Sequence, residues 1–436
     1  MRWDTEQSTS ALNHLTSERP VDEHQLLRIP KSAEEVAFWC AFASVIAVIF
    51  SIAIFHIFFG AALVAMLVGR VRPRFPLIGL PLALFAIGTL IAFAFSEDRS
   101  AGMSQIKHIY LYLTLPVIFT TLRTPSRASL YFMVVAAATA LMAALGCGQY
   151  VNKMHLAHQA GKNFYEFYLE ARITGLQRHW MAFSGQELYG LLIAGAWLFF
   201  APVPKRWNPR IGFATGTACV ALVGIALILT DTRSIWIAAF FGVLYLLWFW
   251  QRKFALLAPV IVAIGLFLAP ADIQKRVDSI IHPHGETDSN SHRVVCWLTG
   301  LEMIKSHPLL GLGPDVQKIK FYEYVPPHIA WPLPVGFYGH LHNIYIQYAA
   351  DRGIPTMLLM VWFLVGIIVA CWRKLKSLPP GRSVSRFVLH AAVACTIGSM
   401  ISGVFEYNLN TSVVLTLFLA IAACAAIAIE NGEPIT

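Results

Sequence analysis

Charged residues are scarce in this chain, and so are the motifs that depend on them. Only 13% of the 436 residues are Asp, Glu, Lys or Arg, whereas 57% are apolar and the mean hydropathy is +0.61. No CxxC, HExxH or carboxylate-rich cluster occurs, so no zinc site of a familiar spacing is predicted. Of the seven cysteines, only Cys296 lies away from an apolar segment, and no framework of disulfides is predicted.

Glycine-rich nucleotide-binding loops are also absent. No Walker or Rossmann fingerprint occurs, and Gly311-Leu312-Gly313-Pro314 lacks the Lys-Ser/Thr that would make it a phosphate loop. We expect that segment to form a tight backbone turn instead. The chain shows no solenoid repeat, heptad run or low-complexity tract. These absences predict a protein that uses neither a cofactor nor a bound metal.

What the chain has in excess is long apolar segments. A segment of about 20 apolar residues crosses a hydrocarbon core roughly 30 Å thick, so each one predicts a transmembrane helix. About twelve such segments predict an all-α, polytopic integral membrane protein. They lie at residues 35–53, 55–69, 76–95, 105–121, 128–149, 181–201, 211–230, 234–250, 254–269, 353–371, 386–405 and 411–429. The first two could form one long helix, started by the capping box Ser32-Ala33-Glu34-Glu35.

Basic residues mark alternate turns between these segments. Lys and Arg favour the cytoplasmic side of a membrane, so their distribution orients the chain. The turns predicted to be cytoplasmic hold Arg70, Arg72, Arg74, Arg123, Arg127, Lys205, Arg206, Arg210, Arg252, Lys253, Arg373, Lys374, Lys376, Arg382 and Arg386. The opposite short turns around 96–99, 231–233 and 406–408 are poorer in cations. Topology therefore explains the net charge of +9, and a nucleic-acid partner is not needed.

This orientation divides the chain into four predicted parts. Residues 1–32 are a cytoplasmic tail without the pattern of a signal peptide, and 33–269 hold transmembrane helices 1–9 with an outer loop at about 150–180. Residues 270–352 form a large periplasmic loop domain, and 353–436 hold helices 10–12 and the C-terminal tail. Both long outer segments are rich in cations, which opposes the insertion bias and predicts an anionic substrate.

Group transfer on the outer face requires a substrate that arrives already activated. A lipid-linked diphosphate sugar has a leaving group that departs without protonation, so one general base and a cationic clamp suffice. His342 is the candidate base, because the stretch from His342 to Gln347 is predicted to open a helix whose dipole disfavours imidazolium. Asn343 and Gln347 would share a face and orient a sugar hydroxyl or the imidazole. His340 is expected to be a turn or surface residue and is kept as a candidate substrate contact, and His342 has the alternative role of an interfacial histidine.

The candidate clamp consists of arginines from separate outer segments. Arg233 lies at a span boundary and Arg293 precedes an apolar stretch, and a guanidinium fork binds phosphate oxygens bidentately. Arg172 and Arg178 are further candidates, and the sequence does not decide which of them contacts substrate. Snorkelling to lipid headgroups is an equally good reading of Arg233.

From about residue 175 onward, the chain resembles a known family. Thr232-Arg233-Ser234-Ile235-Trp236 follows one span, and a long outer loop carries Arg293, Trp297 and the turn Pro308 to Gly313. His342-Asn343-x-x-x-Gln347 and then Gly353 complete the pattern. This combination is similar to the O-antigen ligase (WaaL-type) superfamily, which also includes O-antigen polymerases and protein O-oligosaccharyltransferases.

The resemblance implies a GT-C-like membrane fold and a metal-independent, inverting glycosyl transfer at the periplasmic face of a bacterial inner membrane. The donor would be O-antigen linked to undecaprenyl diphosphate, and the acceptor a sugar of the lipid A-core. The family's loop histidine would map to His342, its loop arginine to Arg293 and its span-boundary arginine to Arg233. Many members have Ser before that last arginine, whereas this chain has Thr232, which weakens the match at Arg233.

Other functions remain open at this point. An O-antigen polymerase uses the same donor type, and two comparable outer loops would favour it, whereas here 270–352 greatly exceeds 150–180. A transporter of anionic lipid would place charges at mid-span and paired helix breaks. The predicted spans hold few ionisable residues, His108 and Glu187 being exceptions. The sequence therefore favours a ligase over both alternatives.

Overall fold

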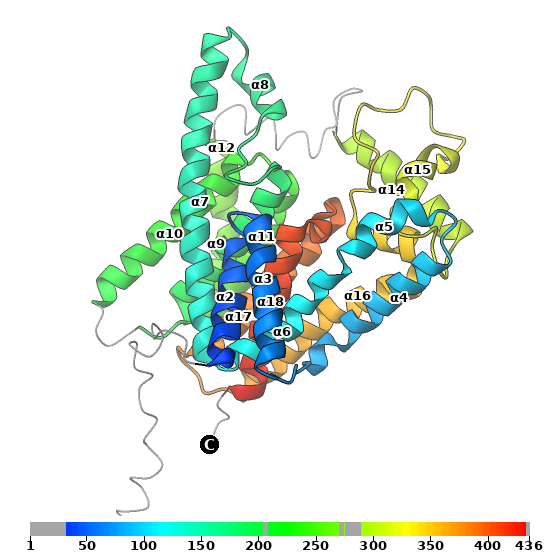
Figure 1. Ribbon diagram of the computed structural model, residues 1–436. Helices are drawn as coiled ribbons and strands as arrows, with labels where there is room; N and C mark the ends of the chain where they lie inside the picture. The colour runs from blue at the N-terminus through cyan, green and yellow to red at the C-terminus, as the bar shows by residue number, and fades with distance from the viewer. Residues whose placement is uncertain (1–31, 204–207, 270–273, 275–288, 433–436) are drawn as a thin grey trace, which may run out of the picture.

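The computed structural model describes residues 32–203, 208–269, 274 and 289–432, and these fold into helices joined by turns (Figure 1). No strand occurs in these residues, which confirms the predicted all-helical membrane class. The tail predicted at 1–32 lies almost wholly outside the described residues, as does most of 270–288.

Twelve helices correspond to the twelve apolar segments. They are α2 (Ala33–Ala47), α3 (Ile52–Val68), α4 (Leu80–Ala94), α6 (Thr114–Leu122), α7 (Pro125–Gln159), α9 (Trp180–Phe200), α10 (Pro209–Leu229), α11 (Arg233–Trp250), α12 (Arg252–Phe267), α16 (Ile344–Ser377), α17 (Val384–Phe405) and α18 (Ser412–Asn431). Shorter elements are η2 (Leu77–Gly79), α5 (Arg99–Lys107), η3 (Ile109–Leu113), α8 (Phe164–Glu170), α14 (Ser289–Ser306), α15 (Gln317–Lys320), η4 (Phe321–Tyr324) and η5 (Asn408–Asn410). Within the described residues, seven helical segments are both long and apolar enough to cross a membrane.

The first apolar stretch is a helical hairpin and not one long helix. The side chain of Ser32 caps α2 by accepting a hydrogen bond from the Glu35 amide at 3.3 Å, as the capping-box pattern predicts. The helix ends at Ala47, and the chain turns before α3 begins at Ile52. The break therefore lies a few residues earlier than the predicted boundary, and α2 and α3 lie side by side (Figure 1).

α17 and α18 form the centre of the bundle. Nearly every residue of α18 is buried, and α17 packs against α7, α9, α11, α16 and α18. Both helices are rich in Ala, Gly, Ser and Cys, and such small side chains let neighbouring backbones approach closely in a membrane protein. By contrast, α12 buries only Ala255 and lies at the periphery. The ends of α17 and α18 are thus fixed points to which a site can be attached.

A second, smaller core lies beside one end of this bundle. Buried side chains from α14, η4, the loops on either side of η4 and the first turns of α16 form it: Val295, Cys296, Met303, Leu312, Val316, Phe321, Leu341 and Ala350. In Figure 1 this unit lies next to α5 and to one end of α4 and α16. It holds the loop that precedes α16 against the helix bundle.

α16 is interrupted where this unit joins the bundle. Gly353 has φ +81°, and a Cβ there would collide with the Leu309 carbonyl, so only glycine fits. The segment 308–313 pairs with the broken turn: the Leu312 amide donates to the Ala350 carbonyl at 2.9 Å and the Ile354 amide to the Pro308 carbonyl at 2.8 Å. Gly311 and Gly313 also have positive φ, in keeping with the tight turn expected there.

Candidate active site

A cavity of about 670 Å³ lies where the loop before α16 meets the helix bundle. Six segments meet around it: the loop between α8 and α9 that holds Arg172, the N-terminal ends of α9 and α11, Arg293 of α14, the loop at 337–342 and the turn at 406–411. Its ionisable lining residues are Arg172, His179, Asp231, Arg233, Arg293, His340, His342 and Glu406. Five of the residues predicted from sequence are therefore brought together, although they span 170 positions in the chain.

His342 lies immediately before α16 and not inside it. The helix begins at Ile344, two residues later than predicted, and Asn343 is its N-cap. His342 itself has φ +49°, an uncommon conformation for a residue with a Cβ. The Trp297 indole donates to the His342 carbonyl at 3.4 Å, and the His342 amide faces His340 Nδ1 at 3.3 Å. Local contacts therefore fix the backbone that carries the imidazole.

Glu406 is the partner of His342, and the sequence analysis missed it. His342 Nδ1 lies 3.4 Å from Glu406 Oε2, and Arg293 donates a short hydrogen bond to the other carboxylate oxygen. Glu406 is 4% exposed and ends α17. Burial alone would raise the pKa of this carboxyl, but the hydrogen bond from His342 and the charge of Arg293 outweigh it and hold the pKa below its ordinary value. Glu406 is thus an ionised acceptor shared by a histidine and an arginine.

The other ring nitrogen of His342 also faces an acceptor. Its Nε2 lies 3.2 Å from the Phe337 carbonyl oxygen. Only one nitrogen of a neutral imidazole can donate, so a neutral ring cannot satisfy both Glu406 and Phe337. If Nδ1 carries the proton toward Glu406, Nε2 presents a lone pair, and the contact with Phe337 must open before that lone pair can accept a proton.

The helix α14 explains the spacing between Arg293 and Trp297. Residues four apart in a helix share a face, so one side of α14 directs Arg293 to Glu406 and Trp297 to His342. Arg233 is the first residue of α11, is 7% exposed and donates to Asn290 Oδ1 at 3.1 Å. The α11 N-terminus adds its positive dipole end to that guanidinium, which favours an anion in the cavity.

The structure separates Arg172 from Arg178. Arg172 lines the cavity and lies over the ring of Trp180, with its guanidinium carbon 5.0 Å from the ring centroid. Arg178 is not among the residues that line the cavity. His179, which does line it, caps α9 by accepting from the Met181 amide at 3.1 Å.

His340 is a lining residue of the cavity and not a surface residue. Its ring lies 4.1 Å from that of His342 between centroids. Burial, with a smaller contribution from the charge of His342, lowers the pKa of His340 to about 3. A neutral His340 is consistent with an Nδ1 that accepts from the His342 amide.

Asn343 and Gln347 hold the backbone and do not line the cavity. Asn343 Oδ1 accepts from the Tyr345 and Ile346 amides at 2.9 and 3.1 Å, which is N-cap chemistry. Gln347 Oε1 accepts from the Leu341 amide at 2.7 Å, and Gln347 Nε2 donates to Asp351 Oδ2 at 3.0 Å. Both side chains therefore fix the ends of the short segment that carries His342.

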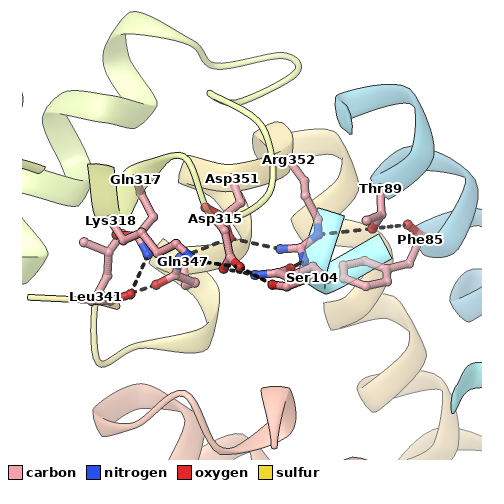
Figure 2. A network of polar contacts seen from close by, with 12 residues as sticks. Phe85, Thr89, Ser104, Asp315, Gln317, Lys318, Leu341, Gln347, Asp351 and Arg352 are labelled. Carbon is pink, nitrogen blue, oxygen red and sulfur yellow. Dashed lines mark hydrogen bonds and ion pairs between the residues drawn. The ribbon is translucent and has the colours of Figure 1, made fainter. Parts of the chain in front are cut away.

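Gln347 also belongs to a buried polar network around Arg352 (Figure 2). Arg352 is 3% exposed and pairs with Asp351, which is fully buried, at 3.3 Å. Its guanidinium also donates to Thr89 at 3.1 Å and, through a short hydrogen bond, to Gln105. The network thus joins α16 to α4 and α5, and neither member of the Asp351–Arg352 pair lines the cavity.

Comparison with known proteins supplies one match. Residues 217–361 match the family model described as O-antigen ligase. The matched segment contains Arg233, Arg293 and His342, whereas Arg172 and Glu406 lie outside it. A search of the curated proteins found no match.

Proposed function

We propose that this protein is an O-antigen ligase, because residues 217–361 match the O-antigen ligase family model in a chain with several helices that could cross a membrane. It transfers a glycan from undecaprenyl diphosphate to a sugar of the lipid A-core, at the periplasmic face of a bacterial inner membrane. The observation that carries the proposal is the single cavity in which three arginines face a histidine bonded to a carboxylate.

The arginines bind the diphosphate of the donor. Arg172, Arg233 and Arg293 reach the same cavity from three separate segments, so one bound anion can contact guanidinium groups from different parts of the chain. Guanidinium groups form bidentate, charge-assisted hydrogen bonds with phosphate oxygens and do so without a metal ion. The diphosphate then leaves as a stable anion when the bond to the sugar breaks.

His342 takes the proton from the acceptor hydroxyl as that oxygen attacks the donor sugar. Glu406 accepts a hydrogen bond from Nδ1–H, which leaves the lone pair on Nε2 and stabilises the imidazolium that forms. Binding of the acceptor must displace Phe337 from Nε2, because that carbonyl occupies the position from which a hydroxyl would donate. Glu406 is therefore a positioning residue for the base.

An O-antigen polymerase remains the second candidate, because the matched family is compatible with either acceptor. The longer outer segment contributes Arg293, Phe337, His340 and His342 to the cavity wall, whereas the shorter one contributes Arg172 and His179, and this asymmetry favours the ligase. A transporter without chemistry is less well supported, because transport requires neither a base nor its carboxylate partner.

The function is tested in a strain that lacks the gene. Loss of the long, capped lipopolysaccharide ladder with accumulation of lipid-linked polymer supports the ligase, whereas single-repeat caps support a polymerase. Unchanged lipopolysaccharide would contradict both. Purified protein, lipid-linked donor and lipid A-core then test whether the chain alone carries out the transfer.

A further inference from the structure

Next to the cavity, a second face of α14 gathers three side chains that the proposed transfer does not need together. His292 and Cys296 are four apart in this helix and therefore share a face, and His342 approaches them from the loop. One potential ligand atom from each residue lies within 4.8 Å of the other two. His292 is 4% exposed and Cys296 is fully buried, so neither side chain is explained by contact with water.

The distances are close to those of a tetrahedral metal site. Cys296 Sγ lies 3.6 Å from His292 Nε2. An ion about 2.3 Å from sulfur and about 2.1 Å from nitrogen in tetrahedral geometry separates those two atoms by about 3.6 Å. The pair on α14 therefore has the required separation already. The His342 ligand atom lies within 4.8 Å of both, so its ring must move toward them and Nε2 must leave the Phe337 carbonyl.

The surroundings supply the other requirements of a metal site. His342 Nδ1 is bonded to Glu406, and a carboxylate on the far nitrogen of a ligating histidine fixes the ring and strengthens its other nitrogen as a ligand. His342 also lines the cavity, which gives an ion a route from solvent. The fourth position can be filled by water from that cavity.

We infer that His292, Cys296 and His342 form a binding site for a thiophilic divalent cation such as Zn²⁺, and that occupation of this site inhibits the enzyme. Two imidazoles and one thiolate are ligands that Zn²⁺ prefers. As the metal–sulfur bond forms, the thiol releases its proton to solvent. The His342 lone pair then binds the metal, so it cannot accept the proton of an acceptor hydroxyl. The inhibition rests on the proposed function, but the binding does not.

Binding is tested without any substrate. Co²⁺ added to the purified full chain in nanodiscs should produce the near-ultraviolet absorption of a cobalt–thiolate bond, with one equivalent bound. Cys296→Ser should abolish that absorption, and His292→Ala should weaken binding at least tenfold, because three ligands fix the ion. Cys147→Ser, which changes a cysteine on α7, is the matched control and should leave the absorption intact. Absorption that survives Cys296→Ser, or no absorption in the wild type, would overturn the site.

Inhibition is tested by transfer from lipid-linked donor at increasing Zn²⁺. The wild type and Cys147→Ser should lose at least tenfold in rate, a chelator should restore it, and Cys296→Ser should resist inhibition. Cobalt bound through Cys296 together with zinc-insensitive transfer would disprove the inhibitory role. A chain that binds cobalt but transfers no glycan would instead disprove the proposed function and leave the metal site standing.

Discussion

Two arginine–carboxylate pairs are connected to the short segment that carries His342, one directly through Glu406 and one through Gln347, and they differ in what surrounds them. Arg293 and Glu406 line the cavity, and the carboxylate is shared with a histidine. Arg352 and Asp351 are closed off, with amide and hydroxyl partners from Gln347, Gln105 and Thr89 (Figure 2). The first pair lines a cavity that has room for a ligand, whereas protein side chains surround the second pair.

The role of an arginine–carboxylate pair therefore depends on what surrounds it. A buried ion pair is tolerated only if other groups supply further hydrogen bonds, as Thr89, Gln105 and Gln347 do around Arg352 and Asp351. A pair beside a cavity can exchange a protein partner for a substrate, because the guanidinium has further donors to offer. Substitutions at the cavity should therefore affect transfer, and substitutions in the buried network should affect folding.

The largest effect is expected at His342. His342→Ala and His342→Gln should each lower single-turnover transfer about 10²–10⁴-fold, because a general base contributes that much, while donor binding and yield of folded protein stay close to the wild type. His340→Ala is the control and should lose much less. Near-normal turnover of His342→Gln with donor prebound would remove His342 from the mechanism.

Arg352→Met should mainly destabilise the protein. It leaves Asp351 as an unpaired buried carboxylate, which costs about 3–5 kcal/mol of folding free energy. We expect a lower yield and a lower midpoint of thermal unfolding, measured by size-exclusion chromatography after heating in detergent.

A matched double variant separates the effect of the unpaired charge on stability from the effect of the changed side-chain shape. Asp351→Asn combined with Arg352→Met removes both charges and keeps an acceptor for Gln347, so it should recover much of the lost stability. A double variant no more stable than Arg352→Met would show that the ion pair is not what stabilises this junction.

Arg293→Lys and Arg233→Lys should weaken use of the donor. Each replaces a fork with a point charge and removes a charge-assisted contact worth roughly 1.5–3 kcal/mol, or about one to two powers of ten in rate at limiting donor. The thermal midpoint should change little at Arg233. Wild-type rates for both lysine variants at limiting donor would contradict the clamp.

A smaller effect concerns pH. His340 is neutral in the folded protein, since burial lowers its pKa to about 3, whereas in the unfolded chain its pKa is about 6.5. As pH falls below about 6.5, the unfolded chain takes up a proton that the folded protein does not, so stability is lost between about pH 6.5 and pH 3. His340→Gln should reduce the fall in thermal midpoint from pH 7.5 to pH 5. Equal slopes for the two proteins would show that His340 does not contribute.

The smallest expected effect is that of a chelator. Exhaustive treatment with EDTA should leave transfer intact, because arginines take the place that a divalent ion occupies in metal-dependent transferases. If the inhibitory site is partly filled as purified, the rate should rise instead. Loss of transfer that one divalent ion restores would show that the reaction requires a metal.

The sequence predicted those parts of the site that rest on local pattern. Arg293 was identifiable as a cation directly before an apolar stretch, and Trp297 entered only with the family resemblance. Glu406 was not identifiable, since it lies in a short turn and meets His342 only through the tertiary packing of α17. A search of the outer turns for an acidic partner of His342 would have suggested Glu406.

Two other differences have local physical reasons. Asn343 was expected to orient either a sugar hydroxyl or the imidazole, but an Asn directly before an apolar helical run is also an N-cap signal, and the capping of α16 uses its oxygen. Arg172 and Arg178 could not be separated, because their segment has no regular period from which a direction follows. The structure distinguishes them by position, since Arg172 lines the cavity and packs against Trp180, whereas Arg178 is not among the lining residues.

The break at Gly353 limits how this protein can be recombined with its relatives. The backbone on both sides of the break forms hydrogen bonds with 308–313: the Ala350 and Asp351 carbonyls accept from the Leu312 and Gly313 amides, and the Ile354 amide donates to the Pro308 carbonyl. A chimera that exchanged the loop up to the start of the membrane helix would take 308–313 from one protein and 350–354 from the other. It would thereby separate two segments that hydrogen-bond to each other. Grafting of a new acceptor preference should therefore carry 308–313 and 350–354 together, or leave both in place and exchange only the residues between them.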